Sequence, residues 1–330
     1  MRLKILYFAL QYDYNNPAQG YSFEHYNFYD ALCRMGHHIL YFDFGTLIQE
    51  LGADAMHLRL LEIVKADKPQ LLFSVLFPPI ELDKKVFREI SENTDTTTLN
   101  WFTDDHWQFE FFSRHWAPCF NWVVTTAQSA LPKYDKIGYK NVIKSQWGCN
   151  HWLYRKLDVP YEYDVTFIGQ PHGNRRAIVH AIRDAGIDVR VWGSGWESGR
   201  VSQPEMIRIF NASRINLNLS NPSVWQRKRR FLFWKNWQRP RDQIKGRNFE
   251  VPGCGGFLLT GKAENLDAYY EDNQEIVTFS NTRDLIAEIR HFLARERERD
   301  AIARAGYERT LREHTYEKRF QEIFAKIGVA

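Results

Sequence analysis

Short apolar runs alternate with segments of helical periodicity along most of this chain, and this alternation constrains its fold more than any other feature. In the first half the apolar runs are 3–9, 38–44, 70–77, 97–103 and 121–126. Helical patterns lie between them, the first at 21–35, ending before Gly36, and others at 53–65 and 83–92. Apolar runs of this length separated by helices predict βαβ units with a parallel sheet.

The alternation breaks between Ser145 and Tyr163, where Pro160 lies, and then begins again. A chain of 330 residues is too long for one ordinary core and suits two lobes of about 150 residues each. We therefore predict an α/β protein of two Rossmann-like lobes, residues 1–155 and 156–315, with parallel sheets facing a cleft. Predicted strands of the second lobe are 164–168, 189–192, 215–219, 256–260 and 275–279, and its predicted helices are 175–185, 203–212, 247–251, 264–270, 282–295 and 301–314, before a last helix at 316–327.

Composition narrows the class of protein. The net charge of +4 is too small to indicate nucleic acid binding by itself. The four cysteines include no CxxC pair, which favours a reduced, cytoplasmic chain without a zinc site. The apolar run near the N-terminus is too short for a signal peptide and no run is long enough for a membrane span.

The strongest local signal is the segment KGRNFE, residues 245–250, which precedes a glycine-rich turn and a predicted strand. Lys245 and Arg247 lie at a predicted helix start, where cations and unpaired backbone N–H groups favour a diphosphate. Asn248 lies between them and Glu250, whose carboxylate could accept both hydroxyls of a ribose. An ordinary surface helix with a solvated charge pair is the alternative.

Two further segments follow predicted strands. Gly169 and Arg175 belong to a strand–turn–helix segment, FIGQPHGNRR, whose turn would let a ligand approach backbone amides, although it lacks the GxGxxG pattern. Asp104, Asp105 and His106 follow a strand of the first lobe. They suit acid–base work or, as the other reading of the carboxylate pair, a divalent metal. The alternatives are a plain β–α turn and a helix cap.

Two segments indicate an acceptor or partner. Asp13, Gly20 and His25 surround the first β–α turn, where an acceptor or a phosphate could approach. Between Gln226 and Arg247 nine Lys and Arg residues occur with one acid, Asp242. The aromatic and basic stretch Trp225–Arg241 predicts contact with an acidic or lipid-linked acceptor, an anionic membrane surface or nucleic acid. A solvated basic helix is the alternative.

The stretches DVTFIGQPHGNR, GRNFEVPGCGGFLLT and IARAGYERTLREHTYEKRF resemble the CgeB-like, spore-maturation type of glycosyltransferase. This family is related to the retaining nucleotide-sugar transferases of the GT-B fold. The resemblance covers about half the chain, and the first half looks like the family's more variable acceptor lobe. It implies that the closing helix, 316–330, crosses back to the N-terminal lobe.

The resemblance also implies roles for individual residues. Related retaining enzymes carry two acids eight positions apart in the donor site, and here Asp242 and Glu250 match, with Asp in place of Glu at the first. Lys245 and Arg247 stand where the family places its diphosphate cations, and His106 loosely matches a histidine that contacts the donor sugar. Such transferases usually need no metal or other cofactor.

The sequence therefore predicts a cytoplasmic hexosyltransferase that uses a nucleotide-sugar donor, retains the anomeric configuration and needs no metal. Two rivals remain open, a non-catalytic nucleotide- or sugar-binding protein and a nucleotide-sugar epimerase on the same architecture. The candidate residues are Asp105, His106 and Asp242 for catalysis and Gly169, Arg175, Lys245, Arg247, Asn248 and Glu250 for the donor.

Overall fold

The computed structural model describes residues 2–78, 81–220 and 242–329 of the chain. Its contacts divide the chain into two compact units. Unit 1 comprises Met1–Gln146 and Tyr316–Ala330, and unit 2 comprises Trp147–Thr315. The boundary drawn by contacts thus follows Gln146, whereas the sequence pattern placed it after residue 155. The basic aromatic stretch Trp225–Arg241 lies outside the described residues.

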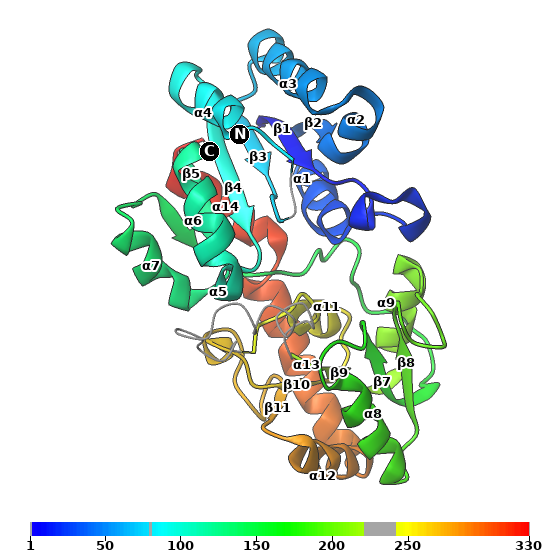
Figure 1. Ribbon diagram of the computed structural model, residues 1–330. Coiled ribbons are helices and arrows are strands. Elements are labelled where there is room, and N and C mark those ends of the chain that lie inside the picture. Colours follow the sequence, from blue (N-terminus) through cyan, green and yellow to red (C-terminus); the bar gives the residue numbers. More distant parts are fainter. Residues whose placement is uncertain (1, 79–80, 221–241, 330) are drawn as a thin grey trace. The chain divides into compact units, whose positions relative to one another are not determined.

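Unit 1 is built on a parallel six-stranded sheet of order β2-β1-β3-β4-β5-β6 (Figure 1). Its strands are β1 (Lys4–Ala9), β2 (His38–Asp43), β3 (Leu71–Ser74), β4 (Thr97–Phe102), β5 (Trp122–Thr125) and β6 (Val142–Lys144). Its helices are α1 (Asp30–Arg34), α2 (Phe44–Leu51), α3 (Ala53–Asp67), α4 (Lys84–Asn93), α5 (Asp105–Gln108), α6 (Arg114–Trp116), α7 (Leu131–Lys136) and α14 (Tyr316–Ile327), with π-helical turns at His25–Tyr29 and Phe109–Ser113.

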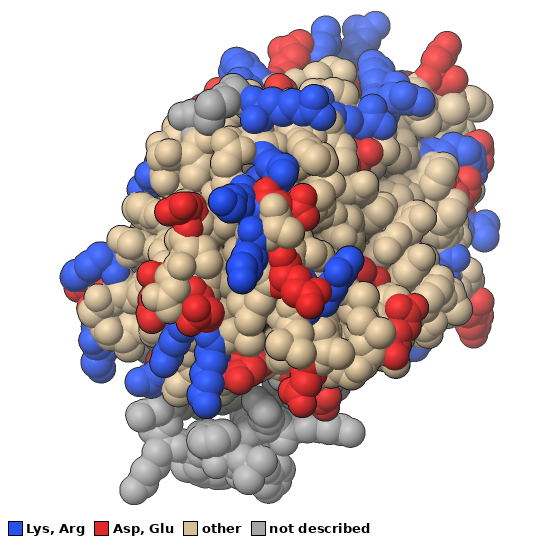
Figure 2. Space-filling model, turned by 90° about the horizontal axis from the view of Figure 1, so that it is seen from above, with Lys and Arg blue, Asp and Glu red and all other residues tan. Residues whose placement is uncertain are grey.

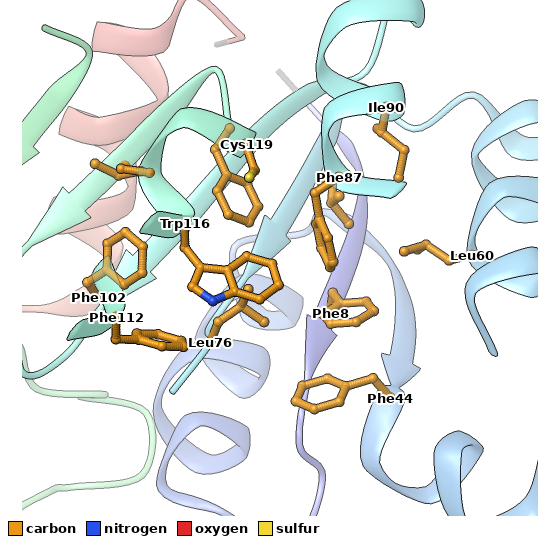
Figure 3. Packing of buried hydrophobic residues seen from close by; sticks show 14 of the residues in the cluster. Phe8, Phe44, Leu60, Leu76, Phe87, Ile90, Phe102, Phe112, Trp116 and Cys119 are labelled. Atoms are coloured by element: carbon orange, nitrogen blue, oxygen red, sulfur yellow. The ribbon is translucent and has the colours of Figure 1, made fainter. Parts of the chain in front are cut away.

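One face of this sheet is covered by an aromatic core that includes side chains from α2 and α4. Phe8 of β1 stacks on Phe44 with ring centroids 4.7 Å apart and meets Phe87 edge to face at 5.4 Å. Phe87 in turn meets Trp116 edge to face at 5.7 Å, and Figure 3 shows Phe87 lying between Phe8 and Trp116. Because successive strand residues point to opposite faces of the sheet, Phe8 packs in this core and its neighbour Tyr7 packs on the other face.

The other face of the sheet is closed by α1 and by α14, the last helix of the chain. Phe320 of α14 is fully buried. Its ring lies 5.6 Å from the rings of Phe28 and Phe73 and 6.4 Å from that of Trp101. The sheet residues Phe73 and Trp101 alternate with Leu72 and Phe102, which belong to the first core. Unit 1 therefore needs the last helix of the chain to cover its sheet.

Unit 2 is built on a parallel five-stranded sheet of order β11-β10-β9-β7-β8. The strands are β7 (Tyr163–Ile168), β8 (Val189–Trp192), β9 (Ser213–Asn218), β10 (Leu258–Gly261) and β11 (Val277–Phe279). The helices are α8 (Arg175–Asp184), α9 (Gln203–Asn211), α11 (Arg247–Gly253), α12 (Thr282–Leu293) and α13 (Glu296–Glu313). Helices α8 and α12 share a core with one face of the sheet, and α9 and α11 share a core with the other.

Local sequence explains several helix starts in both units. Asp43 before α2, Asp83 before α4 and Asn281 before α12 each accept a backbone N–H of the first turn through a side-chain oxygen. Ser202 does the same for α9, which has Pro204 in its first turn. At Gly306 of α13 a side chain would collide with the carbonyl oxygen of Glu275, so glycine permits this close approach.

The α/β class and the parallel sheets predicted from the sequence are confirmed. The predicted helix 264–270 is wrong, because this segment forms only a 3-10 turn, Leu266–Ala268, after Asn265 in the left-handed conformation. The predicted helix 21–35 starts at residue 23 and contains a π-helical turn at His25–Tyr29. Helix α2 and strand β6 were not predicted.

The surface of the described chain is mixed in charge where Figure 2 displays it. On that face basic and acidic side chains are interspersed over the lower part, and basic side chains gather towards the upper edge of the view. Within the described ranges no helix is both long enough and apolar enough to cross a membrane.

Truncation of Phe320 tests the dependence of unit 1 on α14. Phe320→Ala should lower the free energy of unfolding of unit 1 by about 3–5 kcal/mol, because it removes a buried aromatic ring and leaves a cavity. Amide hydrogen exchange of β3 and β4 peptides under increasing urea measures the loss unit by unit. Gln321→Ala, at an exposed position of the same helix, is the matched control. Equal exchange protection in both variants would contradict the role of α14.

Candidate functional site

The candidate donor residues gather at one edge of the unit 2 sheet. Strands β7, β9 and β10 are mutually parallel, so their carboxyl ends lie at the same edge. Gly169 directly follows β7, and Arg175 begins the helix after it. Arg247 begins α11, whose chain leads into β10. Segments more than 70 positions apart in sequence thus converge because the strands share one direction.

Gly169 is fixed at this edge by hydrogen bonds of its own backbone. Its N–H donates to the carbonyl oxygen of Trp192 over 2.8 Å, and its carbonyl oxygen accepts the indole N–H of Trp196 over 2.7 Å. A side chain at position 169 would collide with the ring of Phe167. Glycine at this position leaves room for the ring of Phe167, and the two hydrogen bonds hold residue 169 against Trp192 and Trp196.

Arg175 is almost completely buried beneath the same turn. Its guanidinium donates to the carbonyl oxygens of Gln170, over 2.8 Å, and Leu219, over 2.5 Å, and lies over the ring of Phe167. Burial and the nearby charge of Arg247 lower the pKa of Arg175 to about 10, against which Asp242 raises it. Arg175 therefore stays charged at neutral pH while it ties the end of β7 to the end of β9.

Electrostatic interactions link these residues to the segment that starts at Asp242. Burial and the cations of Arg175 and Lys245 lower the pKa of His172. Burial raises the pKa of Asp242, whereas Lys245 and Arg175 lower it. His172, Arg175, Lys245 and Arg247 therefore form a cluster of basic groups, which we call the basic cluster, with Asp242 as a neighbouring acid.

The turn that carries Lys245 and Arg247 rests on a buried amide network. Asn248 is fully buried and its Oδ1 accepts the backbone N–H of Lys245 and the side-chain N–H of Asn218, both over 2.9 Å. Its amide nitrogen donates to the hydroxyl of Thr260 over 3.2 Å. These bonds join the carboxyl ends of β9 and β10 to the start of α11. Asn248 thus positions the two cations of the turn.

Arg247 is half-buried and carries a donor that the described part of the protein does not satisfy. Its Nε–H is buried, and within residues 2–78, 81–220 and 242–329 it has no hydrogen-bond partner. Lys245, in contrast, donates through Nζ to Oε1 of Gln243 over 3.0 Å. A buried guanidinium donor without a partner is costly, and an anion that accepts from it would remove that cost.

Glu250 lies inside unit 2 and is held by a tyrosine. Only 2% of the residue is exposed, and its Oε1 accepts the hydroxyl of Tyr154 over 2.9 Å. The same hydroxyl accepts from Nε2 of Gln203 over 2.7 Å. The contact with a ribose inferred from the sequence remains a prediction. No local sequence signal marks Tyr154 and Gln203, because they lie far from the motif and resemble ordinary core and surface residues.

The two catalytic candidates of unit 1 have different surroundings. Asp105 is fully buried, and its Oδ2 accepts the hydroxyl of Tyr134 over 2.7 Å. Burial raises its pKa, and hydrogen bonds from Ser113, Thr125 and Tyr134 oppose that rise. His106 is half-buried on the first turn of α5. The side chain of Asp105 thus points into the unit, which suits a positioning role better than direct contact with a substrate, and His106 remains the candidate for contact.

No group of three or more His, Cys, Asp or Glu side chains that could hold a metal ion occurs in the described part of the chain. The carboxylates of Asp104 and Asp105 do not face a common metal position at the surface, because the carboxylate of Asp105 faces inward and accepts the hydroxyl of Tyr134. Metal independence remains a prediction.

Comparisons with known proteins bear on the family and the fold of the chain. Residues 174–325, just under half of the chain, match a family model described as glycosyl transferase-like. Spore protein CgeB of Bacillus subtilis (strain 168) is 24% identical over 224 residues, which span 62% of this chain and 66% of that protein, just under two thirds of its length.

Two solved structures resemble the whole chain. Sucrose-phosphate synthase from Thermosynechococcus elongatus has a TM-score of 0.68 and 10% identity, with 99% of each chain covered. HepE of Anabaena, in complex with UDP-glucose, has a TM-score of 0.68 and 11% identity, with 100% of each chain covered. Identities this low show the shared fold alone. The chain is therefore similar to spore protein CgeB, carries a glycosyl transferase-like region at residues 174–325 and has the GT-B fold.

Proposed function

We propose that this protein transfers a hexosyl group from a nucleotide-sugar donor to a hydroxyl group of an acceptor, with retention of configuration and without a metal ion. The observation that carries the proposal is the basic cluster of His172, Arg175, Lys245 and Arg247 at the carboxyl edge of the unit 2 sheet. It lies in the region that matches the glycosyl transferase-like family, apart from His172, which precedes residue 174. HepE, which shares the fold, binds UDP and UDP-glucose.

The basic cluster suits the diphosphate of such a donor. Arg247 offers a buried Nε–H, and Lys245 adds an ammonium group that Gln243 holds on the same turn. As the bond between the anomeric carbon and the diphosphate breaks, negative charge grows on the departing phosphate. Cations that are already oriented stabilise that charge without reorganisation. The proton of the acceptor hydroxyl passes to the leaving diphosphate as the new glycosidic bond forms.

The other candidates take roles around this cluster. We assign the ribose hydroxyls to Glu250, the turn conformation to Asn248, and the transferred sugar to Asp242. Gly169 lets the donor approach the end of β7. A cationic site of this kind replaces the metal that neutralises the diphosphate in other transferases, and the basic stretch Trp225–Arg241, outside the described residues, stays a candidate for acceptor contact.

Loss of one cation tests the diphosphate site. Arg247→Ala should weaken UDP-glucose binding by about 1.5–3 kcal/mol, roughly a factor of 10 to 100 in Kd, because a charge-assisted hydrogen bond to phosphate is removed. Isothermal titration calorimetry measures the change. Arg190→Ala removes an exposed cation of the same unit, one paired with Asp188, and should leave the Kd unaltered. Similar affinities in both variants would place the diphosphate elsewhere.

The pH dependence of donor binding reports on His172. In the free protein its lowered pKa makes neutral imidazole the favoured form, so its contribution to stability is present above about pH 6.5 and is lost as the pH falls. A bound diphosphate offsets the cations that lower this pKa and raises it. UDP-glucose should therefore bind more tightly as the pH falls through the raised pKa, with uptake of a proton. His172→Asn should flatten the dependence between pH 5 and 8, and an unchanged slope would exclude His172 from the site.

Chelation tests the reaction and its metal requirement together. The purified protein, incubated with UDP-glucose and candidate acceptors, should release UDP and form a product in excess EDTA at the same rate as without it. Loss of activity in EDTA that manganese or magnesium restores would give Asp104 and Asp105 a metal-binding role. Binding of donors without any UDP release identifies a non-catalytic binder, and a new nucleotide sugar formed without acceptor identifies an epimerase. Other nucleotide sugars replace UDP-glucose if it is not bound.

A further inference from the structure

Strand β2 forms one edge of the unit 1 sheet, and the proposed function gives it no role. In the described part of the chain the edge strands are β2 and β6 in unit 1 and β8 and β11 in unit 2. With six residues β2 is the longest of them. An edge strand presents backbone N–H and C=O groups that its own sheet does not use. Proteins therefore protect such strands with charges, prolines or short lengths against the addition of another strand.

The other three edge strands are short and protected by charged side chains. Strand β6 has three residues and ends in Lys144. In β8, which has four residues, the carbonyl oxygen of Val189 accepts from the guanidinium of Arg183 over 3.2 Å. In β11, which has three residues, the carboxylate of Asp272 accepts the backbone N–H of Thr278 over 2.7 Å. Each of these strands thus carries a charged group that opposes pairing with a further strand.

The outer edge of β2 lacks this protection. The N–H of His38 donates to the carbonyl oxygen of Leu3 over 2.8 Å, so His38 and every second residue after it face β1. The backbone N–H and C=O groups of Ile39 and Tyr41 therefore point away from the sheet. Among the residues that the structure describes, no group forms a hydrogen bond with them. The strand, HILYFD, contains no Lys, Arg or Pro, and so offers a complete edge for pairing.

The side chains along this edge are apolar and already held in place. Ile39, Leu40 and Tyr41 are each half-buried. The hydroxyl of Tyr41 donates to the carbonyl oxygen of Leu10 over 3.3 Å, and its ring centroid lies 4.7 Å from that of Tyr29. A strand added to this edge would cover apolar surface that now faces water, and it would order few additional side chains.

The order of residues in β2 favours a second copy of the same strand as the occupant. Antiparallel pairing about a two-fold axis places residues opposite each other that are symmetric about one position. With the axis at Leu40, Ile39 lies opposite Tyr41 of the second copy, which pairs a β-branched side chain with an aromatic one. With the axis at Tyr41, the carboxylate of Asp43 would lie opposite the apolar side chain of Ile39. The register centred on Leu40 is therefore the favourable one.

We propose that two copies of the protein associate through β2, in antiparallel pairing about a two-fold axis at Leu40. The two six-stranded sheets then become one continuous sheet. Ile39 of each copy exchanges both backbone hydrogen bonds with Tyr41 of the other copy, so the outward N–H and C=O groups are satisfied. This inference concerns the assembly of the protein and goes beyond its proposed reaction.

Sedimentation velocity of the full chain at roughly 1–100 μM tests the association. The unaltered protein should reach the mass of a dimer at the upper end of this range. Ile39→Lys should raise the dissociation constant at least about tenfold, because it places a charge within the apolar pairs of the interface. Ile39→Val should keep the dimer. The matched control is Val142→Lys, at a half-buried position of the opposite edge strand β6, and it should also keep the dimer.

Amide hydrogen exchange of the unaltered protein tests the interface without any substitution. The N–H groups of Ile39 and Tyr41 should exchange more slowly at the concentration that gives a dimer than at the lowest one. Exchange of the β1 amides in Ile39→Lys reports whether that variant is folded. A monomer at every concentration overturns the proposal. So does a dimer that Ile39→Lys leaves intact, or one in which the Ile39 and Tyr41 amides gain no protection.

Discussion

In a parallel sheet all strands end at one edge, and the candidate donor site depends on this constraint. Each βα loop of unit 2 must leave the sheet at its carboxyl edge, so residues distant in sequence become neighbours without any direct attraction. Burial first, and then repulsion from the cation of Arg247, lowers the pKa of Arg175. The fold holds them together against this repulsion, which is a reason to expect an anion as the ligand.

The cost of that arrangement is offset by polar groups from the strands themselves. The carbonyl oxygens of Gln170 and Leu219 accept from the guanidinium of Arg175, which stabilises its charge in a buried position. A hydrogen bond from the side-chain amide of Asn218 to that of Asn248 joins the carboxyl end of β9 to the start of α11. Removal of either amide would leave buried polar groups without partners. The basic cluster therefore has its geometry set by side chains that never need to touch a ligand.

Much of the fold and part of the candidate site can be predicted from the sequence. Physical reasons explain why the other features cannot. Apolar periodicity gave the parallel strands, and the order of cation, amide and acid in residues 245–250 marked the turn. His172 belongs to the segment FIGQPHGNRR, which the sequence marks as a candidate. Its electrostatic interaction with Lys245 depends on the packing of two loops that are distant in sequence. Tyr154 reaches Glu250 across 96 positions of sequence, a separation that no local pattern encodes. Paired acids after a strand suggest chemistry at Asp105, and in the fold its carboxylate accepts the buried hydroxyl of Tyr134, a contact that the sequence does not indicate. Its catalytic role remains a prediction.

The return of α14 to unit 1 has a consequence for the order in which the protein is made. Unit 2 is one continuous segment, so all its strands and helices are available once Thr315 has been synthesised. The sheet of unit 1 is synthesised first, but the rings of Phe28, Phe73 and Trp101 stay uncovered until Phe320 has been synthesised. During translation the domain that begins the chain is therefore the last to complete its core. Over that interval its uncovered aromatic face is the surface that a chaperone would have to shield.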